Sequence, residues 1–234
     1  MAKAPDRAPK VAIVHTSLLA VESFTRLFNE LAPNAQLHHL VDDSLLPEVI
    51  QAGRVTKSVH ERLCDLFRVA EKSGADLIFS QCSSVGEVAD AAAEFVDVPI
   101  VKVDEEMAEV ACETGVRIGV AATLGSTLAP TGRLIEATAA RLGKPVELRT
   151  RLIEHAFAAL ESGDRAGHNE RVAQAIRQLA TEVDVVVCAQ GTMAAVLPEL
   201  GELAAPVLTS PRLGVERAVR ILRECAAKKA GEPV

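Results

Sequence analysis

Two short hydrophobic runs of the chain each end in side chains that could take part in chemistry. The first run is DLIFS at 76–80, and Cys82-Ser83-Ser84 follows it. The second is DVVVC at 184–188, and Gln190-Gly191-Thr192 follows that one. An ionised thiol can act as a base or a nucleophile, whereas an amide only forms hydrogen bonds. The ends of the two runs therefore differ in the chemistry they can perform.

The two runs occupy matching places in a repeated unit. Asp76 and Asp184 are 108 positions apart (184 − 76). The segment VAIVHT at 11–16 matches IGVAAT at 118–123 at an offset of 107 (118 − 11), and Pro99 matches Pro206 at the same offset (206 − 99). This pattern indicates a duplicated α/β unit, in which Cys82 and Gln190 are equivalent and one site can form between the halves.

The fold class follows from β-branched runs that alternate with longer amphipathic segments, which is typical of parallel α/β folds. We expect two pseudo-symmetric lobes, each a four-stranded parallel sheet flanked by helices, with the active site in the cleft between them. The first lobe is predicted over 1–104 plus 212–234 and the second over 105–211. Strands are expected near 10–16, 36–41, 76–82, 98–103, 116–122, 146–152, 184–190 and 205–209.

Ligands of parallel α/β sheets bind beyond the carboxyl ends of the strands. The residues expected there are rich in hydroxyls and amides and poor in fixed charge, which suits a small carboxylate held by hydroxyls and backbone N–H groups. Besides the two segments above, the candidates are His15, Thr16, Ser17, Thr123, Ser126 and Thr127.

Cys82 is the sharpest chemical candidate. It is expected just before a helix capped by Ser83 or Ser84, where the helix N-terminus would lower the pKa of the thiol; the alternative is a buried, inert cysteine. Cys188 shares the strand face of Gln190 one pleat deeper, so it could pack in the core or reach the site through a bulge. Ser210 is likewise expected to cap the last helix.

The histidines give weaker signals. His38 and His39 are adjacent on a strand and point to opposite faces, so we expect no metal site there. His15 could orient substrate, transfer a proton or serve only the structure. His155 and His168 flank a Gly-Asp loop and are predicted to lie on the surface.

Composition limits the possible partners. The 234 residues carry a net charge of −7 and contain no Trp or Tyr, which argues against nucleic-acid binding. No segment resembles a signal peptide or a membrane span. Five scattered cysteines without CxxC spacing favour reduced thiols and a cytoplasmic location. The expected partner is a small carboxylate substrate.

With these residues in view, nearly the whole chain resembles the aspartate/glutamate/hydantoin racemase superfamily. The resemblance implies a cofactor-independent enzyme, a homodimer by analogy, and two cysteines on opposite faces of a substrate α-carbon. Cys82 occupies the place of the first cysteine, and Gln190 that of the second. The residues at places similar to those that hold the substrate are Thr16, Ser83, Ser84, Thr123, Thr127 and Thr192.

Three functions remain open. The first is a racemase or isomerase in which Cys82 is the thiolate base at the α-carbon of an amino acid or hydantoin-like carboxylate. In that case Cys188, His15 or a water supplies the proton on the far face, because Gln190 cannot. The second is a lyase or decarboxylase that uses Cys82 alone. The third is a non-catalytic protein that binds a small molecule.

Overall fold

The computed structural model describes residues 7–230, with side chains as far as residue 228. The outer ends of the predicted lobe ranges, 1–6 and 231–234, lie outside the described residues. One sheet consists of β1 (Lys10–His15), β2 (Gln36–Val41), β3 (Leu77–Ser80) and β4 (Ile100–Lys102). The other consists of β5 (Arg117–Ala122), β6 (Glu147–Leu152), β7 (Val185–Cys188) and β8 (Val207–Thr209).

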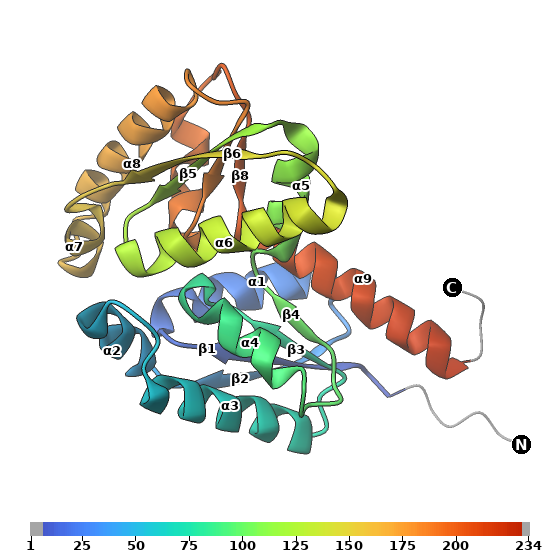
Figure 1. Cartoon of the computed structure of the whole chain (residues 1–234). Helices are drawn as coiled ribbons and strands as arrows, with labels where there is room; N and C mark the ends of the chain where they lie inside the picture. Colours follow the sequence, from blue (N-terminus) through green and yellow to red (C-terminus); the bar gives the residue numbers. More distant parts are fainter. Residues whose placement is uncertain (1–6, 231–234) are drawn as a thin grey trace, which may run out of the picture.

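Helices cover both sheets (Figure 1). Those of the first half are α1 (Val21–Leu31), α2 (Leu45–Ala52), α3 (Lys57–Lys72) and α4 (Gly86–Ala92), with short 3₁₀ helices η1 (Leu18–Ala20) and η2 (Ser83–Val85). Those that follow are α5 (Glu105–Thr114), α6 (Gly125–Leu142), α7 (Ala156–Glu161), α8 (Arg165–Leu179), η3 (Gly191–Glu199) and α9 (Ser210–Ala230).

The two sheets confirm the predicted duplication. Their strand orders, β2-β1-β3-β4 and β6-β5-β7-β8, are the same, and every pairing is parallel. Val11 pairs with Leu77 in the first sheet and Ile118 pairs with Val185 in the second, so the register is repeated as well. Each strand lies within its predicted range. The α/β fold class with two four-stranded parallel sheets is therefore confirmed.

The central strands of each sheet are buried on both faces, as is typical of parallel sheets, whereas the edge strands β2 and β6 are partly exposed. Along β1, Val11 and Ile13 pack against α1 and α9, whereas Ala12 and Val14 face the cluster formed with α2, α3 and α4. In the second sheet, α5 and α6 cover one face, and α7, α8 and η3 cover the other. The last helix therefore returns to the first sheet, where Val215 is fully buried.

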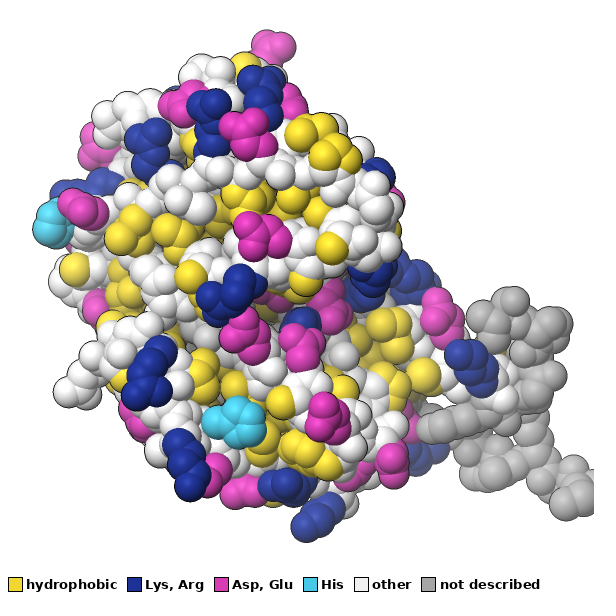
Figure 2. All heavy atoms as spheres, in the orientation of Figure 1, with side chains coloured by type: hydrophobic (Ala, Val, Ile, Leu, Met, Phe, Trp, Pro, Cys, Tyr) yellow, Lys and Arg dark blue, Asp and Glu magenta, His cyan; other side chains and the backbone are white. Residues whose placement is uncertain are grey.

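Ion pairs follow the border between the halves. Arg133 on α6 pairs with Glu87 on α4 at 2.5 Å, and Arg217 on α9 pairs with Glu106 on α5 at 3.0 Å. Figure 2 shows charged side chains of both signs along this border. Pairs as exposed as Arg133 and Glu87 contribute at most about 1 kcal/mol. We therefore attribute the fold to the buried sheets. Among the described residues, no helix has the length and hydropathy needed to cross a bilayer.

Two expected helix caps are wrong. Ser210 is the first residue of α9, and its buried hydroxyl has no hydrogen-bonding partner among the described residues. Neither η2 nor α4 has a side-chain cap, because the Ser84 hydroxyl instead contacts Thr127 from the other half. At Ser84 a contact between the two halves thus replaces the expected cap.

We predict that Gly214→Ala destabilises the protein. A Cβ at Gly214 would overlap the backbone carbonyl of Val103, so α9 would have to move away from the first sheet. Overpacking of this kind typically costs about 1–3 kcal/mol. Urea unfolding followed by circular dichroism measures the change in the free energy of unfolding.

The matched control is Gly132→Ala in α6, where the added Cβ would meet only Leu148 Cδ1 at an ordinary 3.5 Å. This variant should gain about 0.5–1 kcal/mol, because alanine restricts the unfolded chain more than glycine does. Equal stability of the Gly214 variant and the unmodified protein would contradict the close approach of α9.

Candidate active site

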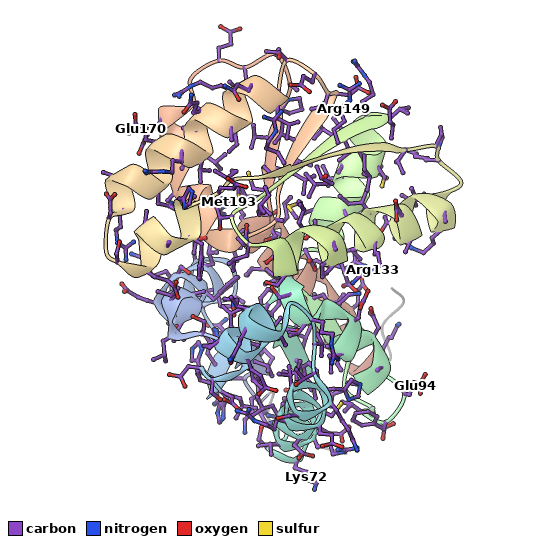
Figure 3. All side chains as sticks on the ribbon, turned by 60° about the vertical axis from the view of Figure 1, so that its left-hand side comes forward. Lys72, Glu94, Arg133, Arg149, Glu170 and Met193 are labelled. Carbon is purple, nitrogen blue, oxygen red and sulfur yellow. The ribbon has the colours of Figure 1, made fainter. Side chains whose placement is uncertain are left out.

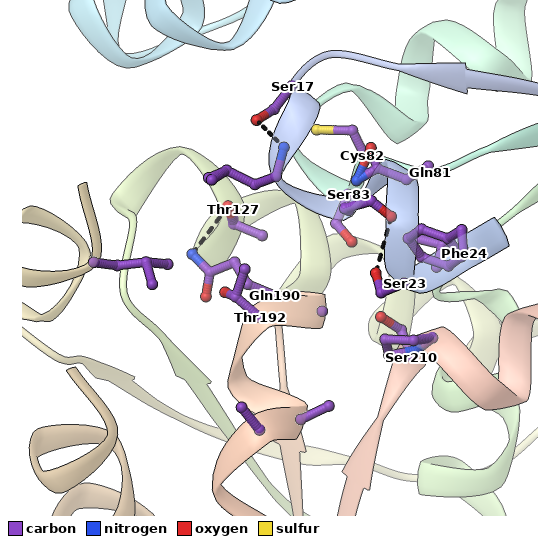
Figure 4. A pocket seen from close by; sticks show the side chains of 18 of the residues that line it. Ser17, Ser23, Phe24, Gln81, Cys82, Ser83, Thr127, Gln190, Thr192 and Ser210 are labelled. Atoms are coloured by element: carbon purple, nitrogen blue, oxygen red, sulfur yellow. Dashed lines mark hydrogen bonds between the residues drawn. The ribbon is translucent and has the colours of Figure 1, made fainter. Parts of the chain in front are cut away.

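A pocket of about 750 Å³ lies where the strand ends of the two sheets face each other. It is lined by both halves of the chain, and Figure 4 shows Cys82 and Gln190 on its wall, from different halves. The predicted site residues that the structure brings together on this wall are Thr16, Ser17, Cys82, Ser83, Ser84, Thr127, Gln190, Gly191 and Thr192. Strand ends that are distant in sequence thus meet around one pocket.

Cys82 lies two residues beyond β3 and immediately before η2. Its side chain is partly exposed to the pocket, although it sits deep within the molecule. Burial raises the pKa of the Cys82 thiol, and hydrogen bonds with Thr16 and Ser84 oppose that rise. The expected lowering of the pKa by the helix end is therefore wrong: the short η2 helix does not outweigh desolvation.

Ser83 and Ser84 point to different partners. The Ser84 hydroxyl lies 2.9 Å from the Thr127 hydroxyl, so the two halves touch through buried hydroxyls beside Cys82. Ser83 interacts with Asp104, a fully buried carboxyl whose pKa is raised by burial and lowered in part by that contact. Asp104 in turn raises the pKa of Cys82 through charge repulsion. A negative charge on either group therefore makes the other harder to ionise.

The Gln190 side chain joins three segments of the second half. Its Oε1 accepts a hydrogen bond from the Thr123 N–H at 2.9 Å, so its Nε2 faces Thr127 and donates to that hydroxyl at 3.3 Å (Figure 4). The Thr127 hydroxyl accepts from Gln190 and also shares a hydrogen bond with the Ser84 hydroxyl, in which either oxygen can be the donor. Gln190 thus fixes the strand ends around the pocket, and no group of its side chain can act as an acid.

The structure does not bring four of the predicted residues onto the pocket wall: His15, Thr123, Ser126 and Cys188. Cys188, the last residue of β7, is 0% exposed and packs with Ala121 and Val186. Burial raises the pKa of its thiol to about 12. The pairing of β7 with β5 and β8 is regular as far as Cys188, so no bulge turns this thiol toward the pocket.

His15, the last residue of β1, is also 0% exposed. Its Nε2 is 2.9 Å from Nδ1 of His39, whose Nε2 lies 3.2 Å from the Thr25 hydroxyl. Burial, and then repulsion from His39, lower the pKa of His15 from 6.5 to about 4. His38 is exposed on the opposite face of β2, as predicted. The described residues include no group of three or more His, Cys, Asp and Glu side chains placed to hold a metal.

His168 is the pocket residue that the sequence analysis missed. It was predicted to lie on the surface, but it is 1% exposed and lines the pocket, whereas His155 is exposed as predicted. The helical spacing of His168, Val172 and Ile176 could have revealed it, because residues four apart share one helix face. All three are buried on the core side of α8.

Several solved structures share this fold. A glutamate racemase from Bacillus anthracis matches with a TM-score of 0.72 and 17% identity over 93% of this chain and 83% of that one. Allantoin racemase from Klebsiella pneumoniae matches with a TM-score of 0.65 and 18% identity over 96% and 89%. A point mutant of arylmalonate decarboxylase gives a TM-score of 0.58 and 18% identity over 92% and 94%.

The model of one family, Asp/Glu/hydantoin racemase, matches residues 11–218. The chain belongs to the Asp/Glu/hydantoin racemase family, which confirms the resemblance inferred from the strand ends. No curated protein matches it in sequence. Because the chain belongs to this family, the pocket is interpreted as the site of an enzyme of racemase type or of a related decarboxylase.

We predict that stability falls as the pH is lowered from 6.5 towards 4. The folded protein protonates His15 only near pH 4, whereas an unfolded chain does so near 6.5, so the unfolded state binds more protons between these values. At about 1.4 kcal/mol per pKa unit, His15 accounts for roughly 3 kcal/mol of that loss. The pKa of His39 is lowered as well and adds to it. Urea unfolding at a series of pH values measures the effect.

His15→Asn should show a shallower pH dependence over the same interval, since the titrating ring is gone. The exposed residue His155 provides the control, and His155→Asn should leave the slope unchanged. An equally steep slope in His15→Asn would assign the pH dependence to other groups.

Proposed function

We propose that this protein is a cofactor-independent isomerase of racemase or epimerase type. In this proposal, Cys82 acts as a thiolate base at the α-carbon of a small carboxylate, an amino acid or a hydantoin-like compound. The observation that carries the proposal is that, among the described residues, Cys82 is the one cysteine on the pocket wall. It stands at a strand end among hydroxyl and amide groups from both halves.

The surroundings of Cys82 suit abstraction of a proton from carbon. A carbon next to a carboxylate is a weak acid, so the charge that moves onto the carboxylate oxygens must be stabilised by positioned donors. Thr16, Ser84 and Thr127 bring hydroxyls to the same wall. Once formed, a thiolate of raised pKa is also a stronger base than an ordinary one.

The pocket also favours a substrate with an apolar part. Carbon-rich side chains form much of its wall, and the largest of those from the second half include Phe157 and Leu160 on α7. Leu19 from η1 also lines the pocket and is 55% exposed. Burial of a substrate group against such side chains contributes about 25 cal/mol for each Å² of apolar surface.

A decarboxylase or lyase is the second candidate, and one specific observation favours it. Gln190 holds its place by hydrogen bonds and Cys188 lies below the wall, so the second half presents no thiol to the pocket. Loss of carbon dioxide leaves a carbanion that needs a proton on one face only, and Cys82 alone can deliver it. The structural similarity to arylmalonate decarboxylase supports this scaffold for such chemistry.

We predict that Cys82→Ala abolishes exchange of the substrate α-hydrogen with solvent and leaves the fold intact. The protein is incubated in heavy water with D- and L-amino acids, hydantoins, 2-hydroxy acids and substituted malonates, and proton NMR follows each compound. Deuterium at the α-carbon with inversion identifies a racemase. Deuterated product after loss of carbon dioxide, without inversion, identifies the decarboxylase.

The matched control is Cys64→Ala on α3, which removes a thiol that does not line the pocket. Unchanged turnover in a folded Cys82→Ala protein would refute the assignment of the base. If none of these compounds is turned over but the protein binds one of them, the result supports the non-catalytic binding function instead.

The pH dependence of turnover provides a separate prediction. Because the pKa of Cys82 is raised above its ordinary value of 9.0, kcat/KM should rise with pH through the neutral range without reaching a plateau below pH 9. The measurement is the initial rate of α-hydrogen exchange at constant ionic strength. A plateau near neutrality would show that the thiol ionises more readily than its burial implies.

A further inference from the structure

His168 stands in the first turn of α8 with its side chain against the pocket. The ring is 1% exposed, whereas Glu170, two residues later, points outward from the same helix (Figure 3). Of the described residues that line the pocket from the second half, Arg165 and His168 are those with ionisable side chains. Arg165 is exposed, so His168 is the buried one.

A chain of hydrogen bonds fixes the orientation of the neighbouring amide. A carboxylate oxygen of Glu199 can only accept, so the group of Asn169 that lies 3.4 Å away is its amide nitrogen. The other end of the amide, Oδ1, therefore faces the His168 ring and lies 3.0 Å from Nδ1. The amide oxygen is an acceptor as well, and Nδ1 of His168 must carry the proton.

The opposite nitrogen of the ring is left without a partner. In a neutral imidazole with the proton on Nδ1, Nε2 presents a lone pair and can only accept. Nε2 is buried and has no hydrogen-bonding partner among the described residues. An unsatisfied buried acceptor costs about 1–3 kcal/mol. A donor brought by a bound molecule would recover this free energy.

We propose that His168 is a specificity residue that accepts a hydrogen bond from an N–H or O–H group of the substrate. This inference rests on the proposed function and narrows its substrates to carboxylates or hydantoins that carry such a donor. A second carboxylate at the same place would be repelled by the lone pair of Nε2, because both groups are acceptors. Asn169 acts as a positioning residue, because it sets the tautomer of the ring.

The first test needs no substrate. Nitrogen-15 NMR of the imidazole rings in the free protein at neutral pH distinguishes a protonated from a bare ring nitrogen, and loss of the signals in His168→Gln assigns them. We expect a proton on Nδ1 and none on Nε2. A proton on Nε2 would overturn the proposal. In Asn169→Leu the preference for this tautomer should be weakened.

The second test compares ligands that differ only in the donor. Calorimetry measures the Kd of phenyllactate and of 2-methyl-3-phenylpropionate, in which a methyl group replaces the hydroxyl. It does the same for 5-benzylhydantoin and its 1,3-dimethyl derivative. The unmodified protein should prefer the donor member of at least one pair by about tenfold, the effect of one satisfied buried acceptor.

Substitutions separate recognition from a structural role. His168→Leu should lose the preference, whereas His168→Gln should retain part of it, since a glutamine carbonyl can accept in place of Nε2. His60 is the matched control, because it occupies the equivalent place in α3 (168 − 60 = 108) and is exposed. His60→Leu should leave both Kd values unchanged.

Two results would overturn the proposal: an equal preference in His168→Leu, or no preference in the unmodified protein for either pair, which includes the absence of binding. Because calorimetry does not require turnover, Cys82→Ala should keep the preference. A retained preference without any Cys82-dependent exchange would refute the proposed catalysis alone, and exchange without the preference would refute the role of His168 alone.

Discussion

When parallel strands are buried on both faces, polar side chains that contact a ligand can lie only at the ends of the strands. The edge strands β2 and β6 carry exposed polar side chains, but the central strands β1, β3, β5 and β7 consist mainly of Val, Ile, Leu and Ala and are buried along nearly all of their length. A charged or hydroxyl group within them would lose its water without gaining a partner. The candidate site is therefore a consequence of the sheets, since two sets of carboxyl ends face one pocket and supply the hydroxyl and amide groups around Cys82, while α1 and α8 add further polar side chains.

The duplication makes two similar halves, and the differences between them define what the pocket can do. Cys82 in one half corresponds to Gln190 in the other, so a possible base is matched by a side chain that holds three segments together. His60 and His168 form a second unequal pair, one exposed and one buried. The two halves thus share one fold but line the pocket with different groups: the first half contributes a thiol, and the second contributes fixed hydrogen-bonding groups.

The sequence predicts the strands well because a buried strand is encoded by local hydrophobic pattern, and the duplication checks each assignment against its copy. The gathering of nine candidate residues follows from the rule that parallel strands share one functional edge. What the sequence does not encode locally is the direction of a side chain after the strand ends. Ser84 contacts Thr127 in the other half, and His168 turns into the core because α8 packs on the second sheet. Neither segment carries a local signal for the contact between Ser84 and Thr127, whereas the burial of His168 is indicated by its helical spacing with Val172 and Ile176.

The pKa of Cys82 shows most clearly what packing adds to local structure. At a pH below the pKa, raising the pKa of a base by one unit lowers its ionised fraction tenfold. The proton-transfer rate of each ionised molecule rises by less than tenfold. Burial of Cys82 would therefore slow the proposed reaction if the thiol acted alone. The same burial removes water from the hydroxyls of Thr16 and Ser84, and donors in such surroundings stabilise a developing negative charge far more than they would in water. Those two residues also hydrogen-bond the thiolate and offset part of its desolvation. The reaction proposed for Cys82 thus depends on the surrounding donors at least as much as on the thiol. A cysteine among strand-end hydroxyls is therefore a stronger indication of a catalytic site than a cysteine alone.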